Sequence, residues 1–327
     1  MDSSQLPDFD DLPRVEGMPQ GCAWSIFDRE GKKDLIGTLN LLTPSVVKAA
    51  YAEARDGKSI SLNHMTLRES ELCDGTGWDD ELHFNTQLSS QWDSLVHWQH
   101  QPTGLAYNGI AVTKDALASP KTTAENAMPT LDHWHPAGGL VARGILIDFK
   151  EWYETKARTE GKGDVIFHPL DGHRITVDEI EAVARDQGVD FRHGDVLIIR
   201  TGLTEILASP QPQDLAKLQL GKISGMHGDV NSAKWIWNRH FAAVAGDSWA
   251  FEALLPLKED GSPGGPNDLV LHPWLLAMFG MPIGELWDLK ALSEHCKKTG
   301  RYSFLLSSAP LNMPGLVGSP ANAVAIF

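Results

Sequence analysis

The sequence predicts a single α/β unit, because three strongly apolar stretches alternate with helix signals along one chain. The stretches at 144–149, 194–202 and 241–248 are typical of buried strands. No internal repeat and no convincing linker divide the sequence. At 327 residues the chain exceeds the usual size of one domain, but some α/β folds reach this length as one unit. We therefore expect one domain over residues 21–327, preceded by an extended arm over residues 1–20.

Composition and charge narrow the classes of function. Hydrophobic residues make up 42% of the chain and charged residues 22%, as in soluble globular proteins. The formal net charge is −15, and no Lys/Arg-rich run offsets it locally, so phosphate backbones and anionic lipid surfaces are repelled. We expect the partner to be a small-molecule substrate rather than a nucleic acid or a membrane.

Cysteine usage and the N-terminus predict a cytoplasmic location. Cys22, Cys73 and Cys296 are odd in number and lack Cys-x-x-Cys spacing, which fits reduced thiols. The N-terminal segment, residues 1–13, is acidic and contains prolines, and it has neither the basic nor the apolar region of a secretory signal. No run approaches the ~18 apolar residues of a membrane span. The start also has little means of burying itself, which is why residues 1–20 are expected to form an extended arm.

The first regular elements follow this arm. Thr43 is a suitable N-cap and Pro44 a suitable first helical residue, so a helix is expected from there through Ala54. Residues 59–62 alternate like a short strand. Residues 66–82 are acidic, glycine-bearing and irregular, and we expect a surface loop there.

The stretch 87–100 concentrates polar groups that can do chemistry. It contains one carboxylate, two imidazoles and several side-chain amides among apolar residues. A strand here would bring Gln91, Asp93 and His97 to one face. A carboxylate and an imidazole on one face can hold a divalent cation or relay a proton to a bound substrate. The alternative is a polar sheet face whose side chains satisfy each other.

The remaining signals alternate between loops, helices and strands. Prolines and glycines at 113–139 predict a long loop, which carries a weak pair of candidate metal ligands, His133 and His135. A capping box, Thr176 with Glu179, starts a helix that ends near residue 187. The later expected elements are a surface excursion at 208–222, a helix at 233–239 capped by Asn231 or Ser232, helices at 272–279 and 289–298, and a strand at 302–306 before a Gly/Pro-rich tail.

Seven short blocks stand in order along the chain: 36–43, 91–97, 107–109, 194–202, 241–252, 272–289 and 307–320. Together they resemble the cyclase family, the metal-dependent hydrolases that include bacterial kynurenine formamidase and isatin hydrolase. The resemblance is closest to the longer fungal and bacterial branch and covers nearly the whole chain. It implies one domain with a mixed, barrel-like β core flanked by helices, a swivelling β/β/α-like arrangement.

The resemblance assigns roles to the stretch 87–100. The family signature is H-x-G-T-H-x-D-x-P-x-H; its first two histidines and its aspartate hold zinc or manganese, and its last histidine is the general acid/base. Asp93 falls on the metal-binding aspartate and His97 on the catalytic histidine. Gln87 and Gln91 fall where the two ligand histidines should be. The stretch therefore resembles a degraded or respecialised copy of the signature.

Two distal positions complete the implied site. His272 falls near a further family ligand, and Glu285 near the family's distal glutamate, with a one-residue shift in the alignment. Amide oxygens are hard donors that suit manganese, magnesium or calcium better than zinc. Three outcomes stay open: a harder metal held through Gln87, Gln91 and Asp93, recruitment of other histidines, or metal-free work with His97 as base. The histidines that could be recruited are His100, His133, His135 and His227.

The function that the resemblance implies is hydrolysis of a cyclic or acyl amide, imide or lactone, with a manganese or zinc ion and a homo-oligomeric assembly. His97 would move the proton of the attacking water, and Glu285 would assist it. A ring-closing cyclase or dehydratase and a catalytically inactive small-molecule binding protein are the alternatives. Serine-hydrolase, dinucleotide and P-loop patterns are absent, so no nucleotide cofactor is expected. The residues expected to contact substrate are Trp92, Trp98, His100, Tyr107 and His227.

Overall fold

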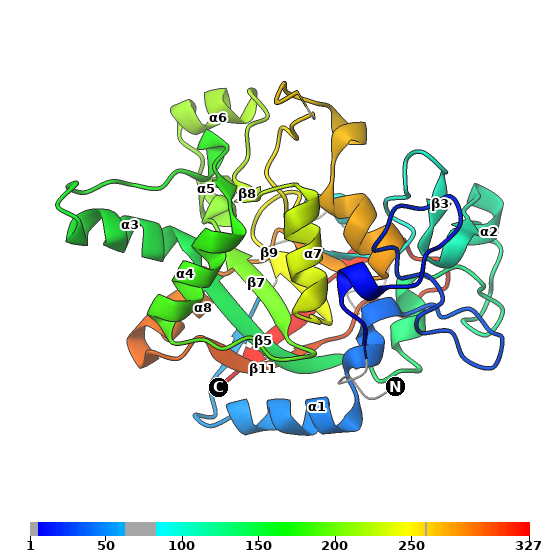
Figure 1. The fold of residues 1–327 in the computed structure, drawn as a ribbon. Helices are drawn as coiled ribbons and strands as arrows, with labels where there is room; N and C mark the ends of the chain where they lie inside the picture. Colours follow the sequence, from blue (N-terminus) through cyan, green and yellow to red (C-terminus); the bar gives the residue numbers. More distant parts are fainter. Residues whose placement is uncertain (1–5, 63–82, 259) are drawn as a thin grey trace, which may run out of the picture.

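The computed structural model describes residues 6–62, 83–258 and 260–327 (Figure 1). Their main feature is a curled nine-stranded mixed sheet, in the order β1-β13-β11-β5-β7-β9-β10-β2-β12, which confirms the predicted α/β class. The strands of this sheet are β1 (Ser59–Ser61), β2 (Gln91–Asp93), β5 (Leu140–Asp148), β7 (Val196–Arg200), β9 (Ala243–Gly246), β10 (Ile283–Glu285), β11 (Ser303–Ser308), β12 (Gly318–Pro320) and β13 (Ala323–Ile326). Two short pairs lie outside it: β3 (Leu105–Ala106) with β4 (Ile110–Ala111), and β6 (Arg174–Ile175) with β8 (Gly225–Met226).

Four neighbouring strands, β5, β7, β9 and β10, run parallel and form the centre of the sheet. Parallel strands are covered on both faces and therefore need apolar side chains at successive positions. That requirement explains why the apolar runs of the sequence predict β5, β7 and β9. All five residues of β7 are buried. β10 has only three residues, which is too short to carry a recognisable pattern, and the sequence does not predict it.

Alternation along β5 divides the core into two parts. Ile145 and Ile147 pack in one cluster with α4 (Val177–Gln187), α7 (Val230–Asn238) and a π-helix, Pro273–Phe279. Leu146 belongs to the other cluster, with α8 (Lys290–Thr299) and the C-terminal strands.

Across the described ranges, no helix is long and apolar enough to cross a membrane. The other helices are α1 (Pro44–Ala50), α2 (Lys114–Ala118), α3 (Phe149–Thr159), α5 (Leu203–Ala208) and α6 (Pro212–Leu218).

The predicted helices are present, although one begins earlier than expected. The hydroxyl of Thr43 accepts a hydrogen bond from the backbone N–H of Val46 at the start of α1. The predicted capping box of α4 is also present. α7 begins earlier than predicted, because Asp229 caps it rather than Asn231 or Ser232. Its side chain accepts from a backbone N–H of the first turn, as an N-cap does.

Several predicted loops contain regular structure. Residues 113–139 include α2 and a 3-10 turn at Leu131–Trp134, and the excursion at 208–222 includes α6. The Gly/Pro-rich tail contains β12 and β13. The loop predicted at 66–82 lies entirely outside the described residues. Tertiary pairing decides these short elements, so local composition did not reveal them.

The N-terminal segment lies against α7 (Figure 1), contrary to the expectation that it has little means of burying itself. Leu6, Phe9 and Leu12 are buried in the core. The ring of Phe9 lies 5.2 Å from that of Trp274, centroid to centroid. The segment is therefore docked through a few apolar side chains that the acidic composition obscures. The division of the chain at residue 20 stays a prediction.

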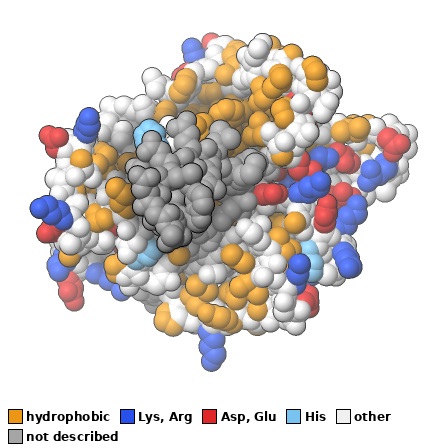
Figure 2. Space-filling model, turned by 180° about the vertical axis from the view of Figure 1, so that it is seen from behind, with side chains coloured by type: hydrophobic (Ala, Val, Ile, Leu, Met, Phe, Trp, Pro, Cys, Tyr) orange, Lys and Arg blue, Asp and Glu red, His pale blue; other side chains and the backbone are white. Residues whose placement is uncertain are grey.

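Charges of both signs are mixed on the surface. On the face that Figure 2 shows, Lys and Arg side chains alternate with Asp and Glu toward the two sides, and hydrophobic side chains gather above and below the centre. No continuous basic patch is seen among the coloured residues of this face.

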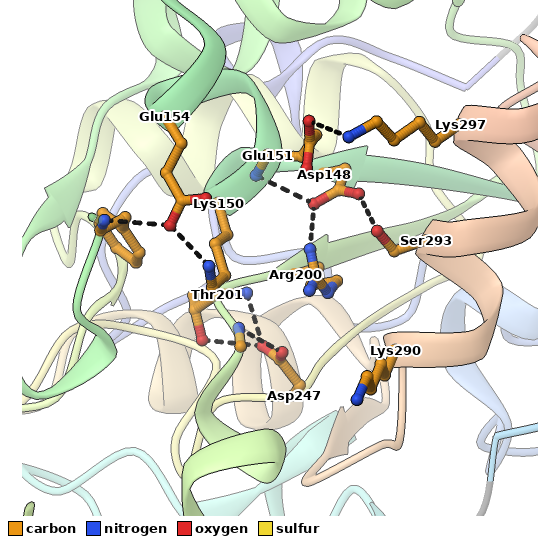
Figure 3. A network of polar contacts seen from close by, with 12 residues as sticks. Asp148, Lys150, Glu151, Glu154, Arg200, Thr201, Asp247, Lys290, Ser293 and Lys297 are labelled. Atoms are coloured by element: carbon orange, nitrogen blue, oxygen red, sulfur yellow. Dashed lines mark hydrogen bonds and ion pairs between the residues drawn. The ribbon is translucent and has the colours of Figure 1, made fainter. Parts of the chain in front are cut away.

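A buried polar network joins the carboxyl ends of the central strands (Figure 3). Arg200, the last residue of β7, donates to Asp148 at the end of β5 over 2.7 Å and to Glu205 over 2.5 Å. The hydroxyl of Ser293 on α8 donates to the second oxygen of Asp148. After β9, Asp247 accepts from the backbone N–H of Thr201 over 2.7 Å. The network ties β5, β7, β9 and α8 together.

We expect Asp148→Ala to lower the free energy of unfolding by about 3 kcal/mol, because it removes the buried carboxylate that Arg200 faces and leaves this guanidinium its contact with the partly exposed Glu205. Asp148 is fully buried and Arg200 nearly so. The measurement is urea unfolding followed by tryptophan fluorescence.

The matched control is Lys297→Ala, which removes an exposed ion pair with Glu151 shown in the same view (Figure 3). Exposed pairs contribute only about 0–1 kcal/mol. Equal stability losses in the two variants would contradict the assigned role of the buried network.

Candidate functional site

A cavity of approximately 340 Å³ brings together polar groups from distant parts of the chain. Gln87, His97, His272 and Glu285 line it. No lysine or arginine of the described chain is among its lining residues. The other lining residues are mostly apolar: Trp98, Gly221, Trp249, Ala250, Leu254, Leu255, Pro256, Gly265, Pro266 and Leu269. The space thus has a polar end and long apolar walls.

The register between β2 and β10 sets which side chains meet. The two strands are antiparallel neighbours, and Gln91 lies directly opposite Glu285. Side chains alternate between the faces of a strand, so Gln91 and Asp93 share one face while Trp92 takes the other. β2 ends at Asp93, so the prediction that the strand continues to His97 is wrong. The chain turns instead, with the N–H of His97 donating to the carbonyl of Ser94.

A chain of amide hydrogen bonds holds one oxygen of each carboxylate. Gln87 donates through Nε2 to Asp93 Oδ1 over 2.6 Å. Gln91 donates through Nε2 to Gln87 Oε1 over 2.6 Å and to Glu285 Oε2 over 2.8 Å. The second oxygens, Asp93 Oδ2 and Glu285 Oε1, and also Gln91 Oε1, are buried and accept no hydrogen bond from the described residues. Buried oxygens of this kind need a partner, because leaving them unpaired is costly.

His272 is oriented by a second buried carboxylate, Glu252. Glu252 Oε1 accepts from both the backbone N–H and the Nδ1 of His272, each over 2.9 Å. Its other oxygen accepts from the backbone N–H of Val270. A side chain at Gly228 would collide with Glu252, because a Cβ there would lie 2.6 Å from Oε2. Since a carboxylate only accepts, Nδ1 carries a proton and Nε2 faces Glu285 Oε1 at 3.3 Å.

The electrostatics of the site call for a positive charge between the carboxylates. Burial, and next the charge of Asp93, raise the pKa of Glu285 to about 7. Burial disfavours the charged form of His272, but its contacts with Glu252 and Glu285 outweigh this and raise its pKa to about 10. In the metal-free protein an imidazolium therefore offsets part of the negative charge of Asp93, Glu285 and Glu252. A divalent cation in place of the Nε2 proton would add one further positive charge and offset more of it.

His97 is the more accessible of the two imidazoles. Its side chain is 20% exposed, and its Nδ1 lies 3.8 Å from Asp93 Oδ1. Burial lowers its pKa, the nearby charge of Asp93 opposes this, and His272 lowers it further. The ring is therefore neutral at pH 7 and able to accept a proton.

Three of the predicted site residues form a group that can hold a metal ion. Asp93, His272 and Glu285 each offer a ligand atom, and these atoms lie within 4.8 Å of one another. The buried Asp93 Oδ2, the Glu285 Oε1 that faces His272 Nε2, and the oriented imidazole of His272 fit such an ion. Two carboxylates and one imidazole are an oxygen-rich set. Glu285, expected to assist His97, has its contacts with His272 and Gln91 instead.

The structure does not bring four of the five expected substrate contacts to the cavity. Trp98 lines it. Trp92 and Tyr107 are fully buried: Trp92 packs between Trp134 and Trp287, and the Tyr107 hydroxyl donates to Asp34. The sequence could not show on which side of β2 the Trp92 ring would lie. The other two expected residues make contacts outside the cavity lining: His100 contacts Thr103, and His227 contacts Asp229.

The other histidines considered for metal binding make different contacts. The Nε2 atoms of His133 and His135 bond the backbone carbonyls of Met128 and Pro310. Neither belongs to the cluster around Asp93. In the described chain, recruitment of these histidines to that cluster is thus not seen.

Sequence reasoning missed Glu252 and most of the apolar wall. Glu252 lies within a block that resembles the family, but only the fold shows that it reaches His272, twenty residues away in the chain. Trp249, Leu254 and Leu269 come from irregular segments around it. Irregular segments give no periodic signal, so their common destination could not be read from local pattern.

A family model and several solved structures are similar to this chain. The family model described as Cyclase matches residues 25–253. The crystal structure of a novel cyclase is 26% identical, with a TM-score of 0.73, over 94% of this chain and 99% of that chain. An isatin hydrolase bound to the product analogue thioisatinate is 12% identical, with a TM-score of 0.52, over 86% of this chain and 98% of that chain. Isatin hydrolase A from Ralstonia solanacearum is 14% identical, with a TM-score of 0.51, over 87% and 98%.

The isatin hydrolase likenesses show a shared fold, and the novel cyclase confirms the cyclase-like arrangement expected from the sequence. Comparison with curated proteins finds no match. The special branch with glutamine in the histidine positions stays a prediction.

We expect Glu252→Gln to weaken divalent-cation binding by about 10–100-fold, as loss of a partner that orients a ligand histidine does. The amide would present a donor to N–H groups that now meet a carboxylate. The measurement is calorimetric titration with MnCl₂. Glu205→Gln, which alters a carboxylate in the Arg200 network, serves as control. Wild-type affinity in a folded Glu252→Gln protein would show that Glu252 does not orient His272 for binding.

Proposed function

The chain belongs to the cyclase family, and we propose that it is a metal-dependent hydrolase of an amide, imide or lactone with an apolar body. The observation that carries this proposal is the polar end of the cavity. At or directly behind that end, Asp93, His272 and Glu285 are each anchored through one atom. Asp93 Oδ2 accepts no hydrogen bond from the described residues, and His272 Nε2 faces Glu285 Oε1 at 3.3 Å. Such preorganisation is typical of a centre that acts on a ligand rather than of a satisfied core.

The walls of the cavity favour an uncharged, apolar substrate body. Trp98 and Leu269 line it, and Trp249, 43% exposed, belongs to the same wall. Aromatic rings present large apolar surfaces on which a flat substrate can stack. Since no lysine or arginine of the described residues lines the cavity, a carboxylate on the far end of a substrate would find no such partner along the apolar walls. The reacting carbonyl would then lie at the polar end.

The polar end supplies what carbonyl hydrolysis needs. A divalent cation held by Asp93, His272 and Glu285 supplies Lewis acidity toward a carbonyl or a water molecule. Glu252 keeps His272 in a single orientation, so no reorganisation of that ring is required during reaction. The amide chain of Gln87 and Gln91 does the same for the two carboxylates.

His97 is placed to move the proton. It lines the cavity next to Trp98 and is neutral at pH 7, because burial lowers its pKa. As a general base it accepts a proton from the attacking water, and as a general acid it returns that proton to the leaving nitrogen or oxygen. The cycle leaves His97 as it began. The products are a carboxylic acid together with an amine from an amide, an amide from an imide or an alcohol from a lactone, joined in one molecule when the substrate is cyclic.

Family and fold support this chemistry. Isatin hydrolases share the fold of the chain, and the family model covers the segment that contains Asp93, His97 and Glu252. These likenesses support hydrolysis as the reaction class. The choice between an amide, an imide and a lactone comes from the sequence resemblance and is part of the proposal.

The test is turnover of a panel of aryl-substituted cyclic imides, anilides and lactones by protein supplied with MnCl₂ or ZnCl₂. We expect His97→Gln to lower kcat/KM by about 10²–10⁴-fold, the usual contribution of a general acid/base. In the wild type, kcat/KM should fall on the acid side only below the ordinary histidine value of about 6.5, because the pKa of His97 is lowered. This acid limb should be absent from the residual activity of the variant.

His83→Gln is the control, since His83 is exposed and does not line the cavity. Turnover that survives both chelation and Asp93→Ala would contradict metal dependence. Ring closure of the open acids without hydrolysis of the panel would instead support a cyclase. Binding of the panel without turnover would support an inactive binding protein.

A further inference from the structure

We propose that this centre is built for an oxygen-preferring dication, Mn²⁺ or Mg²⁺, with Gln91 as a ligand through its amide oxygen and Gln87 as a positioning residue that does not ligate. The inference rests on the proposed function, because it takes the Asp93, His272 and Glu285 group as the metal centre. It goes beyond that function by dividing the two glutamines, which the sequence leaves equivalent, into different roles.

The hydrogen bonds fix the orientation of the Gln91 amide. Its Nε2 has two protons and faces two acceptors, Gln87 Oε1 at 2.6 Å and Glu285 Oε2 at 2.8 Å. Rotating the amide by half a turn would place an oxygen against both acceptors. The amide therefore keeps its nitrogen toward them and its oxygen free. That oxygen is buried, on a residue with no exposed surface, and takes no hydrogen bond from the described part of the chain.

The amide of Gln87 is used at both ends. Its Nε2 donates to Asp93 Oδ1 over 2.6 Å, and its Oε1 accepts from Gln91 Nε2 over 2.6 Å. Ligation through Oε1 would compete with the contact that orients Gln91. Gln87 thus holds Asp93 and Gln91 in place, in the manner of a residue that supports metal ligands.

Three buried oxygens accept no hydrogen bond from the described residues: Gln91 Oε1, Asp93 Oδ2 and Glu285 Oε1, the last of which faces His272 Nε2 at 3.3 Å. Asp93, His272 and Glu285 form the group whose ligand atoms lie within 4.8 Å of one another, and the proposal adds the Gln91 oxygen to that group. All four residues are buried. Carboxylate and carbonyl oxygens suit magnesium and manganese, whereas imidazole and thiolate suit zinc. An amide oxygen at position 91 therefore shifts the preference of the centre away from zinc.

The proposal is tested by giving the centre an imidazole at one position at a time. We expect Gln91→His to increase the Zn²⁺ to Mn²⁺ affinity ratio by about tenfold or more, since a nitrogen ligand replaces an oxygen. Gln87→His should leave the ratio near the wild-type value, because position 87 does not ligate the ion. It should lower the affinity for both metals, because Asp93 and Gln91 lose the side chain that orients them. Affinities are measured by calorimetric titration of the full chain with each metal alone.

Pulsed electron paramagnetic resonance on the Mn²⁺-loaded proteins provides a readout independent of activity and of overall stability. Nitrogen couplings should report one bound imidazole in the wild type and in Gln87→His, and two in Gln91→His. Gln99→His is the matched control, because Gln99 bonds the carbonyl of Val96 and lies outside the centre. It should match the wild type in ratio and spectrum.

Each failure has a distinct meaning. A second imidazole coupling in Gln87→His, or an unchanged affinity ratio in Gln91→His, would overturn the division of roles while leaving metal-dependent hydrolysis intact. Absence of Mn²⁺ binding by the wild type, with turnover retained, would overturn both this inference and the metal dependence of the proposed function. Unfolding of either His variant is detected by circular dichroism. The wild-type protein crystallised with MnCl₂ then decides: manganese bound by the Gln91 oxygen is expected, and manganese bound by the Gln87 oxygen would overturn the division of roles.

Discussion

Two carboxylates buried side by side, Asp93 and Glu285, are the constraint around which the site is arranged. Each has one oxygen held by a side-chain amide and another that accepts nothing from the described residues. Buried charges of like sign destabilise a fold unless a positive charge balances them. Here, His272, which stands between Glu285 and Glu252, supplies one positive charge and offsets part of the negative charge. The cation proposed for this centre would take over that role.

The fold holds this arrangement in place from both sides. The antiparallel register of β2 and β10 sets Gln91 against Glu285, and the fully buried Trp92 anchors the other face of β2 between two further tryptophans. At the carboxyl ends of the central strands, Asp148 and Arg200 fix β5 against β7. Short strands can carry a precise site because the surrounding core is continuous and tightly packed.

The sequence predicts those parts whose cause is local. The apolar runs of β5, β7 and β9 follow from burial on both faces, and the start of α1 follows from Thr43 and Pro44. The resemblance to a known signature led to Asp93, His97, His272 and Glu285, and the structure places all four at or directly behind one cavity. Position along the chain was enough for Asp93 and His97 because they fall in one contiguous signature, and for His272 and Glu285 because the later blocks follow in the same order.

Other features depend on contacts that no local pattern shows. β10 is too short to be recognised, the strand at β2 stops at Asp93 where a longer one was expected, and Tyr107 points into the core rather than toward substrate. Glu252 matters only because the chain folds it onto His272. The separate duties of Gln87 and Gln91 depend on which end of each amide faces a neighbour, which only three-dimensional contacts reveal. Crystals grown with MnCl₂ and measured near the manganese absorption edge would locate the ion. An anomalous peak coordinated by Asp93, Glu285, His272 and the Gln91 oxygen is expected; a peak bound by the Gln87 oxygen, or none at this cluster, would contradict the assignment.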